Sequence, residues 1–498
     1  MSDSTLVQNP DLTRRLSVEL WKDVFEQVSS GGNTFGLDCF DTTAGTQLAS
    51  LQPAFTLSMV CSWWRDIALF TPRIWSSISI YCSSDLTELD KIIAAKERSG
   101  THPLIVAFYG RFDQFYDVEA LVCLIDTAER WAHLRIHPSP ELTIGTRGHQ
   151  RICKTLSSIS SLPILRSIST TDKFSSRVLV FPSFKEAPLL SSVTLHDSLI
   201  PDNSLGSLPL DRIQHLRLVM KAYTCGGRLV FVELLQRCRS LQRLELHDTY
   251  PRQLWGHVNM IATLQHLVSL SITQGEQYLI NVLGVLSSDI RLPSLRTLQI
   301  NVHEGSYPEI IGRESNLCEV FVDFVTTSCL PSQLTTLHLD FPQVSSDTLI
   351  VVLKSVPLLE NLKIILQKGT CSDNLLLAMT ADRLGQVRPE LVPNLLHLHL
   401  GIAHFGKGQT ISFSLLFSML YSRRTSLNLV TDLGVSGLVS SKVVARINSK
   451  DSSNLTPESI LGNSQMALQI LHEQLGRFEL VFRYLPVDVD GEGDVFVL

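Results

Sequence analysis

A short pattern of apolar residues returns along most of this chain, and it constrains the fold more than any other feature. It reads apolar, two variable residues, apolar, one variable residue, apolar. The clear copies are Trp131-Leu134-Ile136, Leu190-Val193-Leu195, Ile213-Leu216-Leu218, Leu241-Leu244-Leu246, Leu267-Leu270-Ile272, Leu295-Leu298-Ile300, Leu334-Leu337-Leu339, Leu359-Leu362-Ile364 and Leu395-Leu398-Leu400. Weaker copies lie at Leu165-Ile168 and Leu427-Leu429. The middle residues are spaced by roughly 23 to 39 residues, and self-similarity at such a period is typical of a solenoid.

Each copy predicts a short strand, because alternate residues of a strand point to the same face. Helical patterns lie between copies, at Phe231-Leu234-Leu235, Val258-Ile261-Ala262, Ile280-Leu283-Leu286 and Leu349-Val352-Leu353. One strand and one helix cannot bury their apolar faces alone, so neighbouring units must stack. The sequence therefore predicts an α/β solenoid with parallel strands on the concave face and helices on the convex face. A doubly wound α/β fold is the alternative, although its glycine-rich phosphate turn is absent from the sequence.

The N-terminal part of the chain has a helical pattern instead. Leu16, Leu20, Val24 and Val28 recur every four residues, which predicts one helix that ends at Gly31-Gly32. The polar stretch 29–52 predicts a loop. Helical spacing then resumes at Leu57, Val60, Cys61, Trp64 and Ala68, and Pro72 suits the first turn of a short helix that carries Ile74 and Trp75. Such a small helical unit is expected to need a partner or a neighbouring domain for stability.

This helical part resembles the F-box family in the order and identity of its residues. The stretch 16–20 followed by Val24-Phe25 is similar to the family's opening helix, with Ser17 where the family usually has proline. The stretch 59–68, MVCSWWRDIA, resembles its second half. The stretch 71–78, TPRIWSSI, is similar to the closing segment of F-box groups expanded in mushroom-forming fungi. The resemblance implies docking onto the Skp-type adaptor of a cullin ubiquitin ligase.

Docking of this kind would place apolar side chains of the helices in pockets of the adaptor. The candidate adaptor-binding residues are Leu16, Val18, Leu20, Val24, Phe25, Val60 and Trp64. Some of them must hold the helical unit together instead, and Trp64 fits either role. The alternative hypothesis is that these helices only cap the repeats that follow.

The repeats resemble the leucine-rich-repeat family, which implies that the side chains flanking each middle apolar residue face outward from the concave wall. These side chains include His133 with Arg135 and Ser192 with Thr194. The candidate target-binding residues on this wall are His215, Arg217, Arg243, Glu245, Gln299, His338, Lys363, His397 and His399. Their mixed polar character suits a protein-binding surface. Solvated strand faces are polar in any case, and the loops beyond the strands compete for this role.

These interpretations divide the chain into an F-box-like helical domain over 12–80, a linking region over 81–130, a leucine-rich-repeat solenoid over 131–430 and a C-terminal cap and tail over 431–498. The predicted function is that of a substrate-recognition subunit of a cullin-type (SCF) ubiquitin ligase. Its partners would be a Skp-type adaptor, a cullin through that adaptor, and a target protein. A protein-interaction scaffold unconnected with ubiquitin ligation is the alternative.

Composition and motifs argue against other classes. The net charge is −6, and no stretch concentrates Lys and Arg with aromatic residues, so neither nucleic acid nor a membrane surface is an expected partner. We expect no signal peptide, since no apolar stretch follows a basic start in the first twenty residues. The ten cysteines form no CxxC pair, so reduced thiols and a reducing compartment, the cytoplasm or the nucleus, are expected. His397 and His399 share one face of a strand but have no third ligand. No nucleophile motif is present. We therefore expect no catalytic residue, metal or cofactor.

Overall fold

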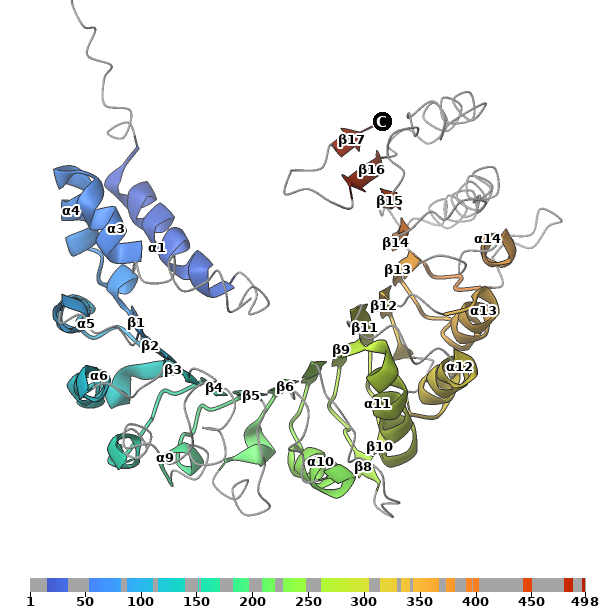
Figure 1. The fold of residues 1–498 in the computed structure, drawn as a ribbon, viewed down its shortest axis with the longest axis horizontal. Helices are drawn as coiled ribbons and strands as arrows, with labels where there is room; N and C mark the ends of the chain where they lie inside the picture. Colours follow the sequence, from blue (N-terminus) through green and yellow to red (C-terminus); the bar gives the residue numbers. More distant parts are fainter. Residues whose placement is uncertain are drawn as a thin grey trace, which may run out of the picture. The chain divides into compact units, whose positions relative to one another are not determined.

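The computed structural model describes most of the chain. The described residues are 16–34, 53–81, 87–110, 115–138, 151, 154–170, 182–196, 208–219, 227–247, 261–303, 314–328, 333–340, 344–366, 373–380, 391–395, 397–402, 442–449, 479–486 and 495–497. The chain divides into two compact units, Met1–Pro209 and Leu210–Leu498. Both are α/β, with parallel strands in a row and helices along one side, so each has the solenoid-like arrangement that the repeated pattern predicts (Figure 1).

Unit 1 begins with helices α1 (Val18–Thr34), α3 (Pro53–Val60) and α4 (Ser62–Leu69) and the 3₁₀ turn η3 (Pro72–Trp75). Ser17 starts α1: its hydroxyl accepts a hydrogen bond from the Leu20 N–H at 3.4 Å, and its carbonyl accepts one from Trp21 at 3.2 Å. Helix capping by serine thus supplies the start signal that proline would otherwise provide.

Two details of the predicted helices differ from the structure. Helix α1 continues past Gly31-Gly32 to Thr34, so the prediction that the glycines end it was wrong. Each glycine costs a helix only about 1 kcal/mol and does not block its hydrogen bonds. The helical spacing from Leu57 to Ala68 is shared by two helices, because Cys61 is extended between them and its Sγ accepts the Trp64 N–H at 3.4 Å.

The sheet of unit 1 starts immediately after the helices. Its parallel strands follow in chain order: β1 (Ser77–Tyr81), β2 (Leu104–Gly110), β3 (Trp131–Pro138), β4 (Ser167–Thr170) and β5 (Ser192–His196). Helices α5 (Thr87–Arg98), α6 (Phe115–Ile125) and α9 (Pro182–Lys185) and the turn η4 (Ala128–Arg130) lie between them in sequence. Residues 81–130, expected to be a linking region, therefore carry one complete strand of this sheet, β2, and the last residue of β1.

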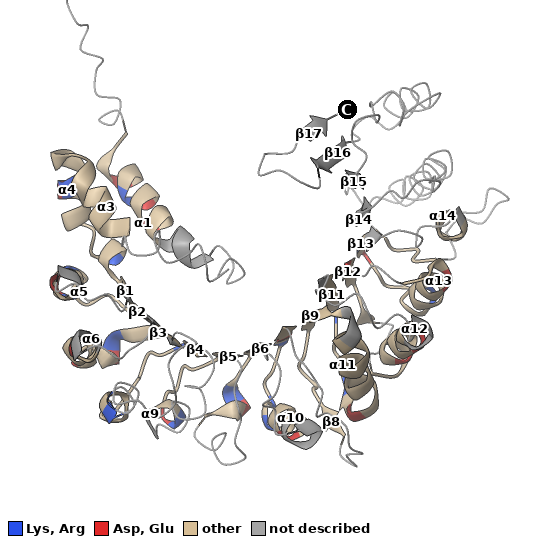
Figure 2. Ribbon diagram, in the orientation of Figure 1, with Lys and Arg blue, Asp and Glu red and all other residues tan. Residues whose placement is uncertain are grey.

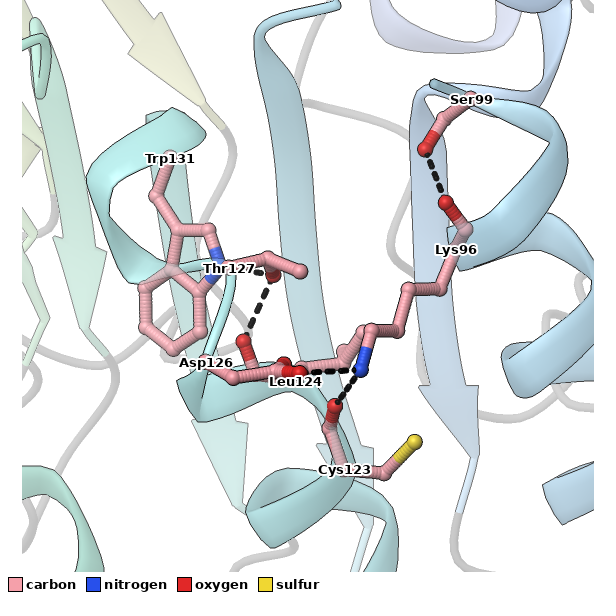
Figure 3. A network of polar contacts seen from close by, with 7 residues as sticks. All are labelled: Lys96, Ser99, Cys123, Leu124, Asp126, Thr127 and Trp131. Atoms are coloured by element: carbon pink, nitrogen blue, oxygen red, sulfur yellow. Dashed lines mark hydrogen bonds and ion pairs between the residues drawn. The ribbon is translucent and has the colours of Figure 1, made fainter. Parts of the chain in front are cut away.

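A polar network joins α5 to the end of α6 (Figure 3). The Lys96 ammonium donates hydrogen bonds to the Cys123 carbonyl at 2.8 Å and to the Asp126 carboxylate at 2.7 Å. Thr127 donates to the Leu124 carbonyl at 2.6 Å and accepts from the Trp131 indole N–H at 3.2 Å. Because Trp131 is fully buried at the start of β3, the network also fixes α6 to the sheet.

Unit 2 repeats the same strand–helix alternation. Its sheet runs in the order β6 (His215–Val219), β7 (Arg243–His247), β9 (Ser269–Gly275), β11 (Thr297–His303), β12 (Thr336–Asp340), β13 (Asn361–Leu366), β14 (His397–Ile402), β15 (Lys442–Ser449), β16 (Glu479–Pro486) and β17 (Val495–Val497). All neighbouring pairs are parallel except the antiparallel pair β16 and β17. Every clear copy of the pattern, in both units, lies at a strand as predicted.

The helical elements of unit 2 lie on one side of its strands (Figure 1). They are η7 (Leu210–Arg212), α10 (Gly227–Arg237), α11 (Glu276–Asp289), α12 (Glu314–Asp323), the π-helical turn η8 (Phe324–Ser328), α13 (Ser346–Ser355) and α14 (Asp373–Met379). The helix predicted around Ala262 was wrong: Ala262 lies in the short strand β8 (Ala262–Thr263), which pairs with β10 (Ile290–Arg291). The weak copy Leu427-Leu429 and Val258 lie outside the described residues.

The repeated apolar residues stack in register. Leu244, Leu270 and Leu298 are direct partners on neighbouring parallel strands, and all three are fully buried. Just before each strand, one backbone carbonyl accepts two N–H groups of the next repeat. The Gln242 carbonyl accepts from the N–H groups of Val268 at 2.8 Å and Ser269 at 3.0 Å. In the next repeat, the Val268 carbonyl accepts from the N–H groups of Arg296 and Thr297, both at 2.9 Å. The paired bonds hold consecutive repeats in one register.

Replacing a stacked leucine should therefore weaken unit 2. We expect Leu298→Ala to lower the free energy of unfolding by about 3 kcal/mol, because it removes buried contacts and leaves a cavity. Leu358→Ala is the matched control, since that side chain is 45% exposed. Urea unfolding of the full chain, followed by circular dichroism, measures both. An equal effect of the two substitutions would contradict the assignment of Leu298 to the core.

Candidate binding surfaces

The apolar residues of α1 divide into a buried and an exposed stripe. Trp21, Phe25 and Ser29, spaced four apart, face inward: Phe25 and Ser29 are buried and Trp21 is half-buried. The neighbouring stripe Leu20, Val24 and Val28 remains exposed, at 51%, 39% and 50%. Helical periodicity alone predicts one broad apolar face, and only packing separates the part that forms the core from the part left over.

The buried stripe belongs to an aromatic cluster. The Trp64 ring of α4 lies 4.8 Å from the Trp21 ring and 5.0 Å from the Phe25 ring, and Trp63 meets Trp21 edge-on at 6.1 Å. Tilted and edge-on ring pairs of this kind add to the stability of a core. Phe25, predicted to bind an adaptor, is fully buried and so belongs to the core of the helical unit. Trp64 is half-buried in the same cluster.

The other predicted adaptor-binding residues are exposed. Leu16 and Val18 lie at the start of α1, Leu20 and Val24 on its outer stripe, and Val60 at the end of α3. Met59 and Phe70, which sequence reasoning did not select, are the most exposed large apolar side chains of the described residues, at 74% and 77%.

The second candidate surface is the strand face of unit 2 that points away from the buried leucines. The register aligns the predicted residues in two rows across the strands. One row holds His215, Arg243, Ser269, Thr297, Thr336 and Asn361, and the other holds Arg217, Glu245, Ser271, Gln299, His338 and Lys363. His397 and His399 continue these rows in the backbone register, and their side chains lie outside the described residues. We call the two rows the strand face of unit 2.

At one end of this face, basic side chains surround Glu245. Its carboxylate lies 2.7 Å from Arg243 Nε and 3.2 Å from His215 Nε2. Arg217 Nε at 3.7 Å and His247 Nε2 at 3.6 Å lie on the other carboxylate oxygen. Sequence reasoning selected four of these residues but missed His247, whose position two residues beyond Glu245 on β7 was the available signal.

The charges of the cluster decide its protonation. Burial by itself would raise the pKa of Glu245. The hydrogen bond from His215, the nearby imidazole of His247 and the charges of His215 and Arg243 together hold that pKa far below its usual range. The carboxylate thus stays ionised where it is 6% exposed. It orients Arg243, whose side chain is 59% exposed and open to a partner, while Arg217 is largely covered.

Other chemistry finds little support in the described part of the chain. No group of three His, Cys, Asp or Glu side chains there is arranged to hold a metal ion. Burial raises the pKa of the Cys238 thiol to about 12, so the nucleophilic thiolate is scarcely formed at neutral pH. Among the helices described, none combines the length and apolar character that crossing a bilayer requires.

Comparison with known proteins adds no assignment. No protein-family model matches the chain, and no curated protein sequence matches it. The resemblance to the F-box and leucine-rich-repeat families therefore stays a prediction from the sequence.

Removal of the Glu245 charge should destabilise unit 2 in a pH-dependent way. We expect Glu245→Gln to cost about 2 kcal/mol at pH 7, because hydrogen bonds between charged groups are lost and four basic side chains remain together. A carboxyl group whose pKa is lower in the folded than in the unfolded protein stabilises the fold at every pH above the unfolded-state pKa, here 4.5. That stabilisation is progressively lost as the pH falls below 4.5.

Urea unfolding of both forms between pH 7 and pH 3 measures this difference. The gap between wild type and Glu245→Gln should be constant at higher pH and shrink below about pH 4.5. Glu360→Gln, at an exposed position just before β13, is the control and should show no such gap. A gap that is independent of pH would show that Glu245 acts through its shape and not its charge.

Proposed function

We propose that this protein is the substrate-recognition subunit of a cullin-type (SCF) ubiquitin ligase. Its helical unit is an F-box that docks on a Skp-type adaptor, and its solenoid is made of irregular leucine-rich repeats that bind a target protein. The protein itself is not an enzyme in this proposal, and ubiquitin transfer is carried out by other subunits. It would act in the cytoplasm, the nucleus or both.

The observation that carries the proposal is the exposed apolar stripe of α1. The core of the helical unit is completed by the aromatic cluster, yet Leu20, Val24 and Val60 remain outside it, each more than a third exposed. Exposed apolar side chains gathered on one small helical unit are typical of a surface that a partner covers. They fall in the segments that resemble the F-box, where helix-in-groove docking is expected.

The packed connection between the helical unit and the sheet suits a substrate-recognition subunit, which must hold its target at a defined place relative to the adaptor. The Trp75 indole N–H of η3 donates to the Ala68 carbonyl at 2.8 Å, and the Arg98 guanidinium of α5 lies 4.5 Å above the Trp75 ring. Strand β1 follows two residues later, and Ile105 of β2 donates to the Ser76 carbonyl at 2.8 Å. A short, packed connection restricts the volume that a bound target explores and raises its effective concentration at the ligase.

A repeat scaffold outside any ligase remains the second candidate. Its support is that Trp75 also closes the first edge of the sheet: it is buried at the start of β1 and packs edge-on against Phe55 of α3 at 5.0 Å. Solenoids need terminal elements that cover the apolar end of the stack. The helices would then serve stability alone, and the exposed apolar stripe would have no assigned partner.

Adaptor capture separates these two functions. We expect the full chain to retain a Skp-type adaptor in a pull-down from co-expressing cells. The double variant Leu20→Ser, Val60→Ser should lose at least about tenfold in affinity, since two apolar side chains that the adaptor would cover become polar. Phe25→Ala and Trp64→Ala are unsuitable for this test, because both side chains belong to the aromatic cluster.

Val351→Ser is the matched control, because Val351 is 49% exposed on α13, which belongs to unit 2 and not to the helical unit. It should bind the adaptor like wild type, and all variants should keep the wild-type circular dichroism spectrum. Absence of adaptor binding by the wild-type chain would reject the ligase function and favour the scaffold.

Target binding by the strand face of unit 2 is tested separately. We expect Ser269→Arg with Thr297→Arg to abolish co-purification of target proteins while leaving the adaptor bound, because bulk is added in the middle of this face and the Glu245 cluster is left intact. Affinity purification with quantitative mass spectrometry measures both. Thr326→Arg, exposed on η8, is the control. Unchanged target recovery with the double variant would place recognition elsewhere, for example on the loops.

A further inference from the structure

The strand face of unit 1 carries basic residues and no acidic ones. Strands β1 to β5 contain no Asp or Glu at any position, although the whole chain is acidic. The acidic residues that surround this sheet in the described part of unit 1 lie on helices and turns (Figure 2). The apolar core residues Phe108, Leu134, Ile136 and Ile168 alternate along the strands with polar ones, which therefore share the face opposite the core. These polar residues are Tyr109, His133, Arg135 and His137, all half-buried, and Ser169, which is buried.

Arg135 is at the centre of this face. Its partners in the register are Ala107 on β2 and Ser169 on β4, both small, so neither covers a long side chain between them. Arg135 is half-buried, and it makes no ion pair with any carboxylate among the residues that the structure describes. A guanidinium that is partly removed from water and lacks a counter-charge attracts an anion more strongly than an exposed one does.

Oriented polar groups flank Arg135 on its own strand and on the next. His133 Nδ1 lies 2.7 Å from the Ser167 hydroxyl, and His137 Nε2 lies 3.4 Å from the Ser169 hydroxyl. The His137 ring stacks on Tyr109 with the ring centroids 5.5 Å apart. These contacts hold both imidazoles beside Arg135. Burial, together with the charges of Arg135 and Arg166, lowers the pKa of His133, so its ring is neutral at pH 7 and serves as a hydrogen-bonding group.

The strand face of unit 2 contains an acidic residue, Glu245, whereas strands β1 to β5 of unit 1 contain none. In unit 2, two arginines and two histidines on equivalent strand positions enclose the carboxylate of Glu245. In unit 1, Arg135 stands between His133 and His137 on the same face of β3, and Arg135 has no carboxylate partner among the residues that the structure describes. An anionic side chain supplied by another molecule would complete the same arrangement, and the planar guanidinium is suited to a carboxylate because it can donate two parallel hydrogen bonds.

We propose that the strand face of unit 1 centred on Arg135, with His133, His137 and Ser169 around it, binds an acidic peptide segment, whose Asp or Glu carboxylate pairs with the Arg135 guanidinium. The binding site is separate from the strand face of unit 2. It does not depend on adaptor docking or on a role in ubiquitin ligation, so it can be tested whether or not those hold.

The test is a titration of the full chain with a fluorescent, acetylated oligo-glutamate peptide, followed by fluorescence anisotropy. We expect saturable binding that weakens as salt is added, and no binding of the matching oligo-glutamine peptide. Arg135→Gln should reduce the affinity at least about tenfold, whereas Arg135→Lys should retain part of it, because charge is kept and the paired hydrogen bonds are lost. Arg212→Gln, at an exposed position in unit 2, should leave binding unchanged.

A second variant keeps Arg135 but gives it a carboxylate partner within the protein, so that the guanidinium cannot bind a peptide. Ser169→Asp places a carboxylate opposite Arg135 in the register, so it should compete with the peptide and abolish binding without loss of the arginine. Thermal unfolding checks that each variant is folded. Equal binding of oligo-glutamine, or wild-type affinity in both Arg135→Gln and Ser169→Asp, would overturn the proposal. Binding of a phosphoserine peptide but not of oligo-glutamate would overturn the assignment to carboxylates.

Discussion

The rest of this structure depends on the lateral stacking of apolar side chains between parallel strands. No single repeat encloses a core, so Leu270 is buried only because Leu244 and Leu298 flank it in register. The backbone reinforces that register where each strand begins, since one carbonyl receives two N–H groups from the following repeat. Alternate residues are thereby forced onto the open face, and every candidate site on the strands follows from this arrangement.

The same constraint explains why the two strand faces carry their charges differently. A carboxylate on the open face of a packed sheet is half-enclosed by its neighbours, and it persists there only when basic groups compensate for its desolvation. Glu245 meets this condition through Arg243 and His215. The first unit places Arg135 in a similar position among small neighbours and provides no internal acid on its strands. One face is thus neutralised from within, and the other is open to neutralisation from outside.

The core of the helical unit is small, so part of the apolar surface of its helices stays exposed to solvent. Helix α1 has apolar residues around more of its circumference than α3, α4 and η3 can cover. The aromatic cluster takes Phe25 and Trp21, whose rings lie 5.8 Å apart, and Leu20 and Val24 stay outside. Its tight connection to β1 through Trp75 means that whatever covers the exposed stripe is held at a defined place relative to the first strands.

Sequence periodicity by itself determined where the strands lie and which of their residues face inward, because the alternation of a strand and the spacing of the repeats leave few other ways to bury the leucines. It also located the helices of the N-terminal unit. The two earliest strands, β1 and β2, were not predicted. For β1 the signal was present, since Trp75-Ile78-Ile80 obeys the same pattern, but Trp75 was assigned to the helical unit. Trp75 does belong to the helical unit, where its indole N–H donates to the Ala68 carbonyl, and it is also buried next to the start of β1.

Only the tertiary structure decided which apolar and charged residues are left available to partners. Phe25 and Val24 are adjacent and equally apolar in the pattern, yet one is fully buried and the other 39% exposed, since their fates depend on where α4 packs. The grouping of His247 with Glu245, and the isolation of Arg135, likewise depend on side chains from strands that are distant in sequence. Such contacts between repeats have no signal in the local pattern, because strand pairing and not sequence spacing brings the residues together.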